Sequence, residues 1–257
     1  NQMLTEIELP YVLNGVECYS SASIGIATYP LDGRSPGILL RNADIALYKA
    51  KNAGRNSIKF FEAGMNLDAQ NRHQIANQLR RALEFDELYL VYQPCLDLQN
   101  NCIIGAEALL RWRNPSLGDV SPVDFIPIAE ETGLIVSIGN WVIDQVCQQA
   151  SLWEQTLGNS LRLAVNLSPR QFKAPQLIEA ICNALQRHHL SANHLELEIT
   201  ERLLLDDSPA TQSLMNQLQK MDLRLAIDDF GTGYSALSYL RKFSLNILKI
   251  DRSFITD

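Results

Sequence analysis

Five strand-like segments of the sequence each place a polar side chain on the face opposite their apolar residues. In residues 195–200, for example, Glu196 and Glu198 alternate with leucine and isoleucine, so the two glutamates share one face of an extended chain. The polar residues at corresponding positions of the five segments are Glu107, Asn166, Glu198, Asp228 and Lys249. If the apolar faces pack under helices, these side chains converge in the interior at the strand ends, where a barrel of parallel strands carries its chemistry.

The five residues have the composition of a site for hard divalent cations. Carboxylates that gather in one place are costly unless cations balance them. Oxygen ligands together with one asparagine carbonyl suit Mg²⁺ or Mn²⁺ rather than zinc. Asp229 directly follows Asp228, and adjacent carboxylates are a common way to bridge two metal ions for phosphoryl chemistry. A solvated charge is the simpler interpretation of any single residue, but it requires five coincidences here.

Two further features accompany these residues. Residues 229–235 are glycine-rich and join a strand to a helix, so their backbone N–H groups can approach phosphate oxygens, although a plain connection is the alternative. Arg111 shares the strand face of Glu107, about 13 Å further along at ~3.3 Å per residue. A guanidinium there can clamp a phosphate, but an exposed surface arginine fits the spacing equally well.

The elements that must hold these residues alternate in type. Helical patterns lie between the later strand-like runs, and this alternation predicts parallel strands with covering helices. The predicted strands are residues 89–98, 103–112, 161–167, 195–200, 223–230 and 247–250.

The first part of the chain has a different organisation. We expect a strand at 16–30, a helix at about 37–53 and a short strand at 57–61. A polar helix at 67–85 has one narrow apolar stripe, which indicates a connector; the coiled-coil seam of a homodimer is the alternative interpretation. The predicted divisions of the chain are residues 1–62, the connecting helix 63–86, and residues 87–257.

Composition limits the class of protein. The net charge of 257 residues is 22 − 29 = −7, which argues against binding of polymeric nucleic acid. No apolar run approaches the ~20 residues of a membrane helix, and the sequence opens without a signal-peptide pattern. Five cysteines without a Cys-x-x-Cys pair favour a reducing compartment. We therefore expect a cytoplasmic location, in a parent protein that a segment outside this chain can anchor to a membrane.

The motifs resemble those of a known family. The stretch from Glu107 to Trp112 resembles the name-giving motif of the EAL-domain cyclic di-GMP phosphodiesterases, and the likeness covers about residues 70–257. Residues 16–60 are similar to the C-terminal end of a GGDEF, or diguanylate cyclase, domain. The other stretches that match EAL motifs in order and spacing are Tyr92-Gln93-Pro94, Asn166-Leu167-Ser168, Glu198-Ile199-Thr200-Glu201, residues 228–235 and Leu248-Lys249-Ile250-Asp251.

The resemblance implies a fold and a role for each site residue. The family fold is a (β/α)₈ barrel with one reversed strand, which agrees with the hairpin expected at 89–112, and the chain would stop after the sixth strand. One metal ion would be held by Glu107, Asn166, Glu198 and Asp228, and a second by Asp228 with Asp229. Lys249 would touch the attacking water or the second metal site, Glu201 would steady the loop after Asp228, and Gln93 and Arg111 would contact the substrate.

The activity that the resemblance implies is hydrolysis of cyclic di-GMP to linear pGpG with two Mg²⁺ or Mn²⁺ ions, in a GGDEF–EAL tandem with an upstream sensor domain. One alternative is a domain that binds cyclic di-GMP without cutting it, although the complete carboxylate set argues against this. Another is a signalling scaffold that acts through the helix at 67–85. A late glutamate and a late glutamine of the family would lie beyond Asp257, so we expect the 257-residue chain itself to be inactive and its parent active.

Overall fold

The computed structural model describes residues 2–158, 161–204, 208–231 and 245–255. The chain divides into two compact units, residues 1–75 and 76–257. No helix in the described ranges is both long and apolar enough to cross a membrane.

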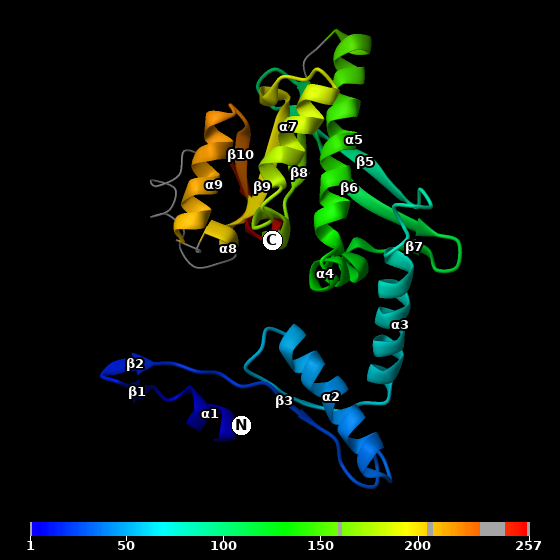
Figure 1. Ribbon diagram of the computed structural model, residues 1–257, viewed down its shortest axis with the longest axis vertical. Helices are drawn as coiled ribbons and strands as arrows, with labels where there is room; N and C mark the ends of the chain where they lie inside the picture. The colour runs from blue at the N-terminus through cyan, green and yellow to red at the C-terminus, as the bar shows by residue number, and fades with distance from the viewer. Residues whose placement is uncertain (1, 159–160, 205–207, 232–244, 256–257) are drawn as a thin grey trace. The chain divides into compact units, whose positions relative to one another are not determined.

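The first unit is built around one helix packed on a two-stranded sheet (Figure 1). Gly25 lies directly under that helix, because a Cβ there would come within 2.1 Å of the Leu47 backbone nitrogen. The prediction of a single strand at 16–30 is wrong: this segment forms two short strands, which belong to different sheets. The elements are α1 (Gln2–Glu8), β1 (Tyr11–Leu13), β2 (Val16–Cys18), β3 (Ile24–Ile26), α2 (Pro36–Asn52) and β4 (Ile58–Phe60).

The helix α3 (Gly64–Leu79) crosses the boundary between the two units. It ends six residues before the predicted end at 85, and residues 80–86 form turns instead. The polar composition of this segment supplies few apolar contacts to extend the helix further.

The second unit contains a sheet in which the strands follow the order β11-β10-β9-β8-β6-β5. The hairpin partners β5 and β6 are antiparallel, whereas all pairs from β6 to β11 along this order are parallel. This is the strand order of a barrel with its first strand reversed, as predicted. A short strand that the sequence pattern did not reveal, β7 (Gly118–Val120), pairs with the end of β6. The other strands are β5 (Leu88–Asp97), β6 (Cys102–Asn114), β8 (Arg162–Asn166), β9 (Leu195–Thr200), β10 (Arg224–Phe230) and β11 (Ile247–Ile250).

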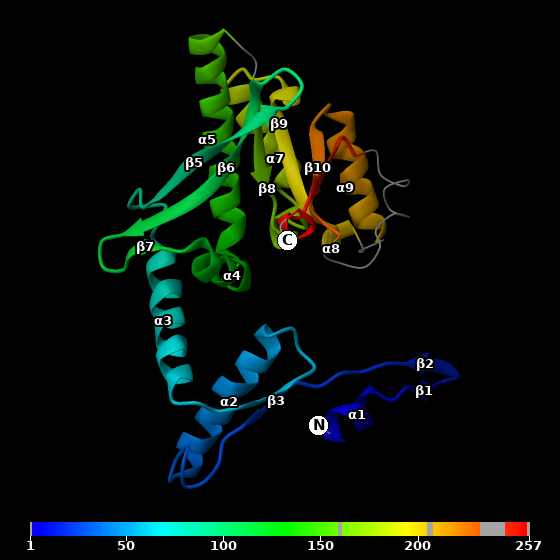
Figure 2. The same cartoon turned by 180° about the vertical axis from the view of Figure 1, so that it is seen from behind.

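The longer helices α5, α7 and α9 lie along one face of this sheet, and the view from behind shows the strands in front of them (Figure 2). The apolar residues of β8, β9 and β10 are buried, and so are the inner residues of the helices. Since alternate residues of a strand point to opposite faces, this packing leaves the polar residues for the other face. The helices are α4 (Pro122–Thr132), α5 (Leu134–Leu157), α6 (Pro169–Phe172), α7 (Leu177–Arg187), α8 (Glu201–Leu204) and α9 (Pro209–Lys220), with short 3₁₀ turns at Ala192–His194 and Arg252–Phe254.

Candidate active site

The register of the sheet brings polar residues of four strands to neighbouring positions. Glu198 on β9 pairs with Asn166 on β8 and with Ala226 on β10, while Glu107 on β6 pairs with Ala164. The two alanines have short side chains, so the space beside them is left to the longer polar groups. Side chains whose strands are not neighbours in the sheet also meet: Lys249 on β11 contacts Glu107 on β6, 142 residues away in the sequence.

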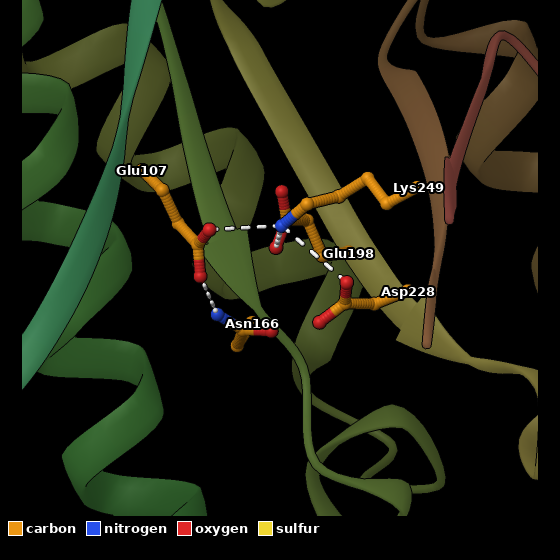
Figure 3. Close-up of polar contacts among 5 residues, drawn as sticks. All are labelled: Glu107, Asn166, Glu198, Asp228 and Lys249. Atoms are coloured by element: carbon orange, nitrogen blue, oxygen red, sulfur yellow. Dashed lines mark hydrogen bonds and ion pairs between the residues drawn. The ribbon is translucent and has the colours of Figure 1, made fainter. Parts of the chain in front are cut away.

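The ammonium group of Lys249 lies at the centre of the cluster (Figure 3). Its Nζ atom donates hydrogen bonds to Glu107 Oε2 at 2.8 Å and to Glu198 Oε2 at 2.6 Å, and lies 3.4 Å from Asp228 Oδ1. The Nδ2 atom of Asn166 donates to the other oxygen of Glu107 at 2.7 Å. All five residues that the alternation pattern singled out are thus connected, three carboxylates through Lys249 and Asn166 through Glu107, and we call them the Lys249 cluster.

Burial sets the electrostatics of this cluster. The side chain of Glu198 is only 2% exposed, and burial raises its pKa to about 7, although the Lys249 ammonium opposes that shift. Burial alone would lower the pKa of Lys249, but its hydrogen bonds to Glu107 and Glu198 raise it above the ordinary value. Lys249 is therefore a cation, and three carboxyl groups face it.

The donor set of the Lys249 cluster suits a hard divalent cation. Carboxylate oxygens from β6, β9 and β10 converge on one positive atom, and carboxylates with an amide oxygen are the ligands that Mg²⁺ and Mn²⁺ accept. In the part of the chain that the structure describes, no group of three or more His, Cys, Asp or Glu side chains is close enough to hold a metal as it stands. The carboxylates are arranged around the ammonium, so a divalent ion held by the same carboxylates would have to share or take the position of Lys249 Nζ.

The chain turns sharply directly after Asp228. Asp229 has a φ of +51° and Gly231 a φ of +100°, and a carboxyl oxygen of buried Glu201 accepts a hydrogen bond from the Gly231 amide at 3.1 Å. Burial, Asp228 and Asp251 all raise the pKa of Asp229. Glu201 thus contacts the turn that follows Asp228, and Asp229 lies within that turn. Residues 232–235 of the glycine-rich segment lie outside the described residues.

The two residues expected to contact a substrate have different surroundings. Gln93 on β5 is the register partner of Glu107, so it faces the same side of the sheet. Arg111 donates from Nη1 to the carbonyl oxygen of Leu110 on its own strand at 2.8 Å. Among the described contacts, Arg111 has none with the Lys249 cluster.

A second charged group was missed by the sequence analysis. It lies one step down the strands from the cluster and consists of Glu196, which is 8% exposed, with Arg162 and Arg224 on the flanking strands. Burial raises the pKa of Glu196, and the charges of Arg162 and Arg224 counteract that shift. The sequence contained a signal for this group. Arg162 precedes Asn166, and Arg224 precedes Asp228, by an even number of residues on the same strand, so each pair shares one face of its strand.

The sequence matches two domain families. The profile of the EAL domain matches residues 76–257, and that of the diguanylate cyclase, GGDEF domain matches residues 1–57.

Curated relatives align with the whole chain. MucR of Pseudomonas aeruginosa, named a bifunctional diguanylate cyclase/cyclic di-GMP phosphodiesterase, is 46% identical over 256 residues, which cover 100% of this chain and 37% of MucR. PdeR of Escherichia coli K12, named a cyclic di-GMP phosphodiesterase, is 37% identical over 257 residues, which cover 100% of this chain and 39% of PdeR. The chain therefore spans less than two fifths of the length of these relatives.

A solved structure is similar to most of the second unit. The MucR phosphodiesterase in complex with c-di-GMP matches with a TM-score of 0.68 and 47% sequence identity. The match covers 71% of this chain and 74% of that one.

Proposed function

The chain belongs to the EAL-domain family, and from this membership we propose that residues 76–257 carry a metal-dependent phosphodiesterase site that hydrolyses cyclic di-GMP to linear pGpG. The names of MucR and PdeR and the cyclic di-GMP in the MucR structure support this substrate. The observation that carries the proposal is the Lys249 cluster, where three carboxylates, one amide and one ammonium from five strands meet at one point.

The residues of the cluster divide into groups that hold metal and groups that hold substrate. We assign Glu107, Asn166, Glu198 and Asp228 to one Mg²⁺ or Mn²⁺ ion, and Asp228 with Asp229 to a second. Ions bound there would make a coordinated water a better nucleophile and neutralise phosphate charge.

Lys249 acts as a held positive charge in this reaction. Its hydrogen bonds to Glu107 and Glu198 raise the pKa of Lys249, which favours the ammonium form over a base that takes a proton from water. Its ammonium can instead stabilise negative charge on a phosphate oxygen as water attacks phosphorus, the P–O bond to the ribose breaks, and the ribose oxygen leaves. The hydrogen bond from Asn166 to Glu107 keeps that carboxylate oriented toward Lys249.

The remaining assigned residues shape the site. Glu201 holds the turn after Asp228 through the Gly231 amide, which keeps Asp228 and Asp229 in place. Gln93 faces the cluster from β5 and would contact the substrate directly. Arg111 would have to exchange its bond to the Leu110 carbonyl for a phosphate oxygen, a favourable exchange for a guanidinium.

The organisation of the whole protein is also proposed. Residues 1–62 would be the end of a diguanylate cyclase domain, 63–86 a connecting helix and 87–257 the phosphodiesterase domain, in a cytoplasmic protein with an upstream sensor. A homodimer through the connecting helix is part of this proposal.

The test is turnover and binding by the full-length protein, with Mg²⁺, with Mn²⁺ and with EDTA. We expect release of pGpG, followed by chromatography, only when a divalent ion is present. Calorimetry in EDTA measures binding of cyclic di-GMP separately. Tight binding of cyclic di-GMP without turnover under any metal condition would overturn hydrolysis in favour of a receptor. If the protein neither binds nor hydrolyses cyclic di-GMP, a signalling scaffold would be favoured instead.

A further inference from the structure

The segment that follows Asn166, at the end of β8, is attached to the end of another helix by a single arginine. Arg170 lies in α6, and its Nη1 atom donates to the carbonyl oxygens of Glu130 at 2.5 Å and Glu131 at 3.0 Å. These carbonyls belong to the last turn of α4, and the Glu130 carbonyl also accepts a hydrogen bond from the Gly133 backbone N–H at 3.3 Å, so the guanidinium is a second donor to it. A positive charge at this end is also favoured by the helix dipole.

The guanidinium group fits closely against the bend between α4 and α5. Gly133 ends α4 with a φ of +85°, which other residues rarely adopt. A Cβ at Gly133 would lie 2.9 Å from Nη2 of Arg170. The left-handed backbone therefore favours glycine here, and a methyl group at this position would also require the end of the Arg170 side chain to shift.

A second contact seats α6 on α5. The side chain of Gln171 is 1% exposed and lies against Gly139, where a Cβ would come within 2.2–2.4 Å of its amide group. Ser168 caps α6 by accepting a hydrogen bond from the Gln171 amide at 3.1 Å. A short helix of four residues is thus held at both ends.

The path from this attachment to the Lys249 cluster is short. Asn166 is the last residue of β8, and the next residue, Leu167, donates its backbone N–H to the Glu198 carbonyl at 2.8 Å. Only three residues lie between Asn166, which contacts Glu107, and Arg170, which contacts α4.

We propose that Arg170 is a positioning residue: by tying α6 to the end of α4, it holds Asn166 in the orientation that contacts Glu107. The part of this proposal that concerns catalysis rests on the proposed function. The attachment itself is a property of the folded chain and can be measured without metal or substrate.

Hydrogen exchange on the metal-free protein tests the attachment. We expect Arg170→Ala to speed exchange of the amides of residues 166–172, and Arg170→Lys to do so less, because an ammonium can keep one of the two carbonyl bonds. Arg187→Ala is the matched control, since Arg187 also joins two helices, through Asp144 of α5 at 2.5 Å, away from this segment. Unchanged exchange in Arg170→Ala, or equal acceleration by the control, would overturn the proposal.

Turnover tests the consequence for the site. Residues that orient metal ligands typically change metal affinity or activity by about 10–100-fold when removed. We therefore expect Arg170→Ala to lower kcat and the affinity for Mg²⁺ by about that factor, Arg170→Lys to recover part of both, and Arg187→Ala to leave both unchanged. These assays use the full-length protein. Turnover by Arg170→Ala equal to that of the wild type would contradict positioning. An inactive full-length wild type would contradict the proposed function, and the exchange result alone would then decide the attachment.

Gly133→Ala approaches the same contact from the other side and serves if Arg170→Ala fails to fold. The added methyl group pushes against the guanidinium, so the amides of residues 166–172 should again exchange faster. A normal exchange rate in this segment, in a variant whose melting curve shows that it is folded, would contradict the attachment.

Discussion

Two groups of charges in the second unit have similar distances and different surroundings. Arg113 Nε lies 2.7 Å from Asp119 Oδ1 on the β6–β7 hairpin, and both side chains are about two thirds exposed. Lys249 lies 2.6 Å from Glu198, which is 2% exposed. Water screens the first pair, so it contributes little. The second pair is screened much less, because Glu198 is buried and Lys249 is 29% exposed, and each partner depends on the other. The comparison teaches that burial and convergence, rather than distance, distinguish a candidate site from an ordinary surface pair.

Removing the buried carboxylate of Glu198 should have the largest effect and is the most severe test of this comparison. Glu198→Ala should lower pGpG release by more than the about 100-fold typical of a residue that only orients a metal ligand, because it removes a proposed ligand itself. The measurement is kcat of the full-length protein for cyclic di-GMP at saturating Mg²⁺. Glu198→Gln keeps the volume and should be nearly as damaging, and turnover close to wild type in either variant would refute the metal assignment.

Removing the central cation should show how strongly the carboxylates depend on it. Lys249→Met leaves Glu107, Glu198 and Asp228 facing one another, and loss of one partner of a buried pair costs about 3 kcal/mol or more. We expect a lower Tm without metal and a larger gain in Tm on adding Mg²⁺ than the wild type shows. An equal response of both proteins to Mg²⁺ would mean that metal and ammonium do not share this position.

The second charged group, Glu196 with Arg162 and Arg224, sharpens the comparison, because it is buried but lies outside the Lys249 cluster. Burial raises the pKa of Glu196, which means that the folded state disfavours its charge; Glu196→Gln keeps the shape and removes that charge, so it should raise rather than lower the free energy of unfolding at neutral pH. Denaturant unfolding measures this change. Turnover should change much less than in Glu198→Gln, and an equal loss of activity would place Glu196 in the site.

The exposed pair should give the smallest effect. Asp119→Asn is expected to change the free energy of unfolding by less than about 1 kcal/mol, with the difference disappearing at high salt. Denaturant unfolding at two salt concentrations checks this. A loss as large as that of Lys249→Met would show that exposure does not separate the two groups.

Much of the fold and of the site could be predicted from the sequence because the period of two in a strand is local. Alternation alone identified Glu107, Asn166, Glu198, Asp228 and Lys249 as residues of one face, and the structure brings all five together. The EAL and GGDEF resemblance is confirmed by the domain matches, and the reversed first strand by the antiparallel pairing of β5 and β6.

Some expectations failed where tertiary contacts override local pattern. The run 16–30 is not one strand, since β2 pairs with β1 while β3 pairs with β4. The helix expected at 67–85 stops at Leu79, and β7 forms only because the end of β6 offers it a partner.

What the sequence by itself determined is which side chains share a face, since backbone geometry within one strand decides that. Which atoms meet was decided by the tertiary structure, because strand register sets distances between residues far apart in the chain. Lys249 at the centre of the carboxylates, Arg111 on its own strand's carbonyl and Arg170 on the end of α4 all belong to this second class. No local period specifies such contacts, because each depends on the packing of two or more separate elements.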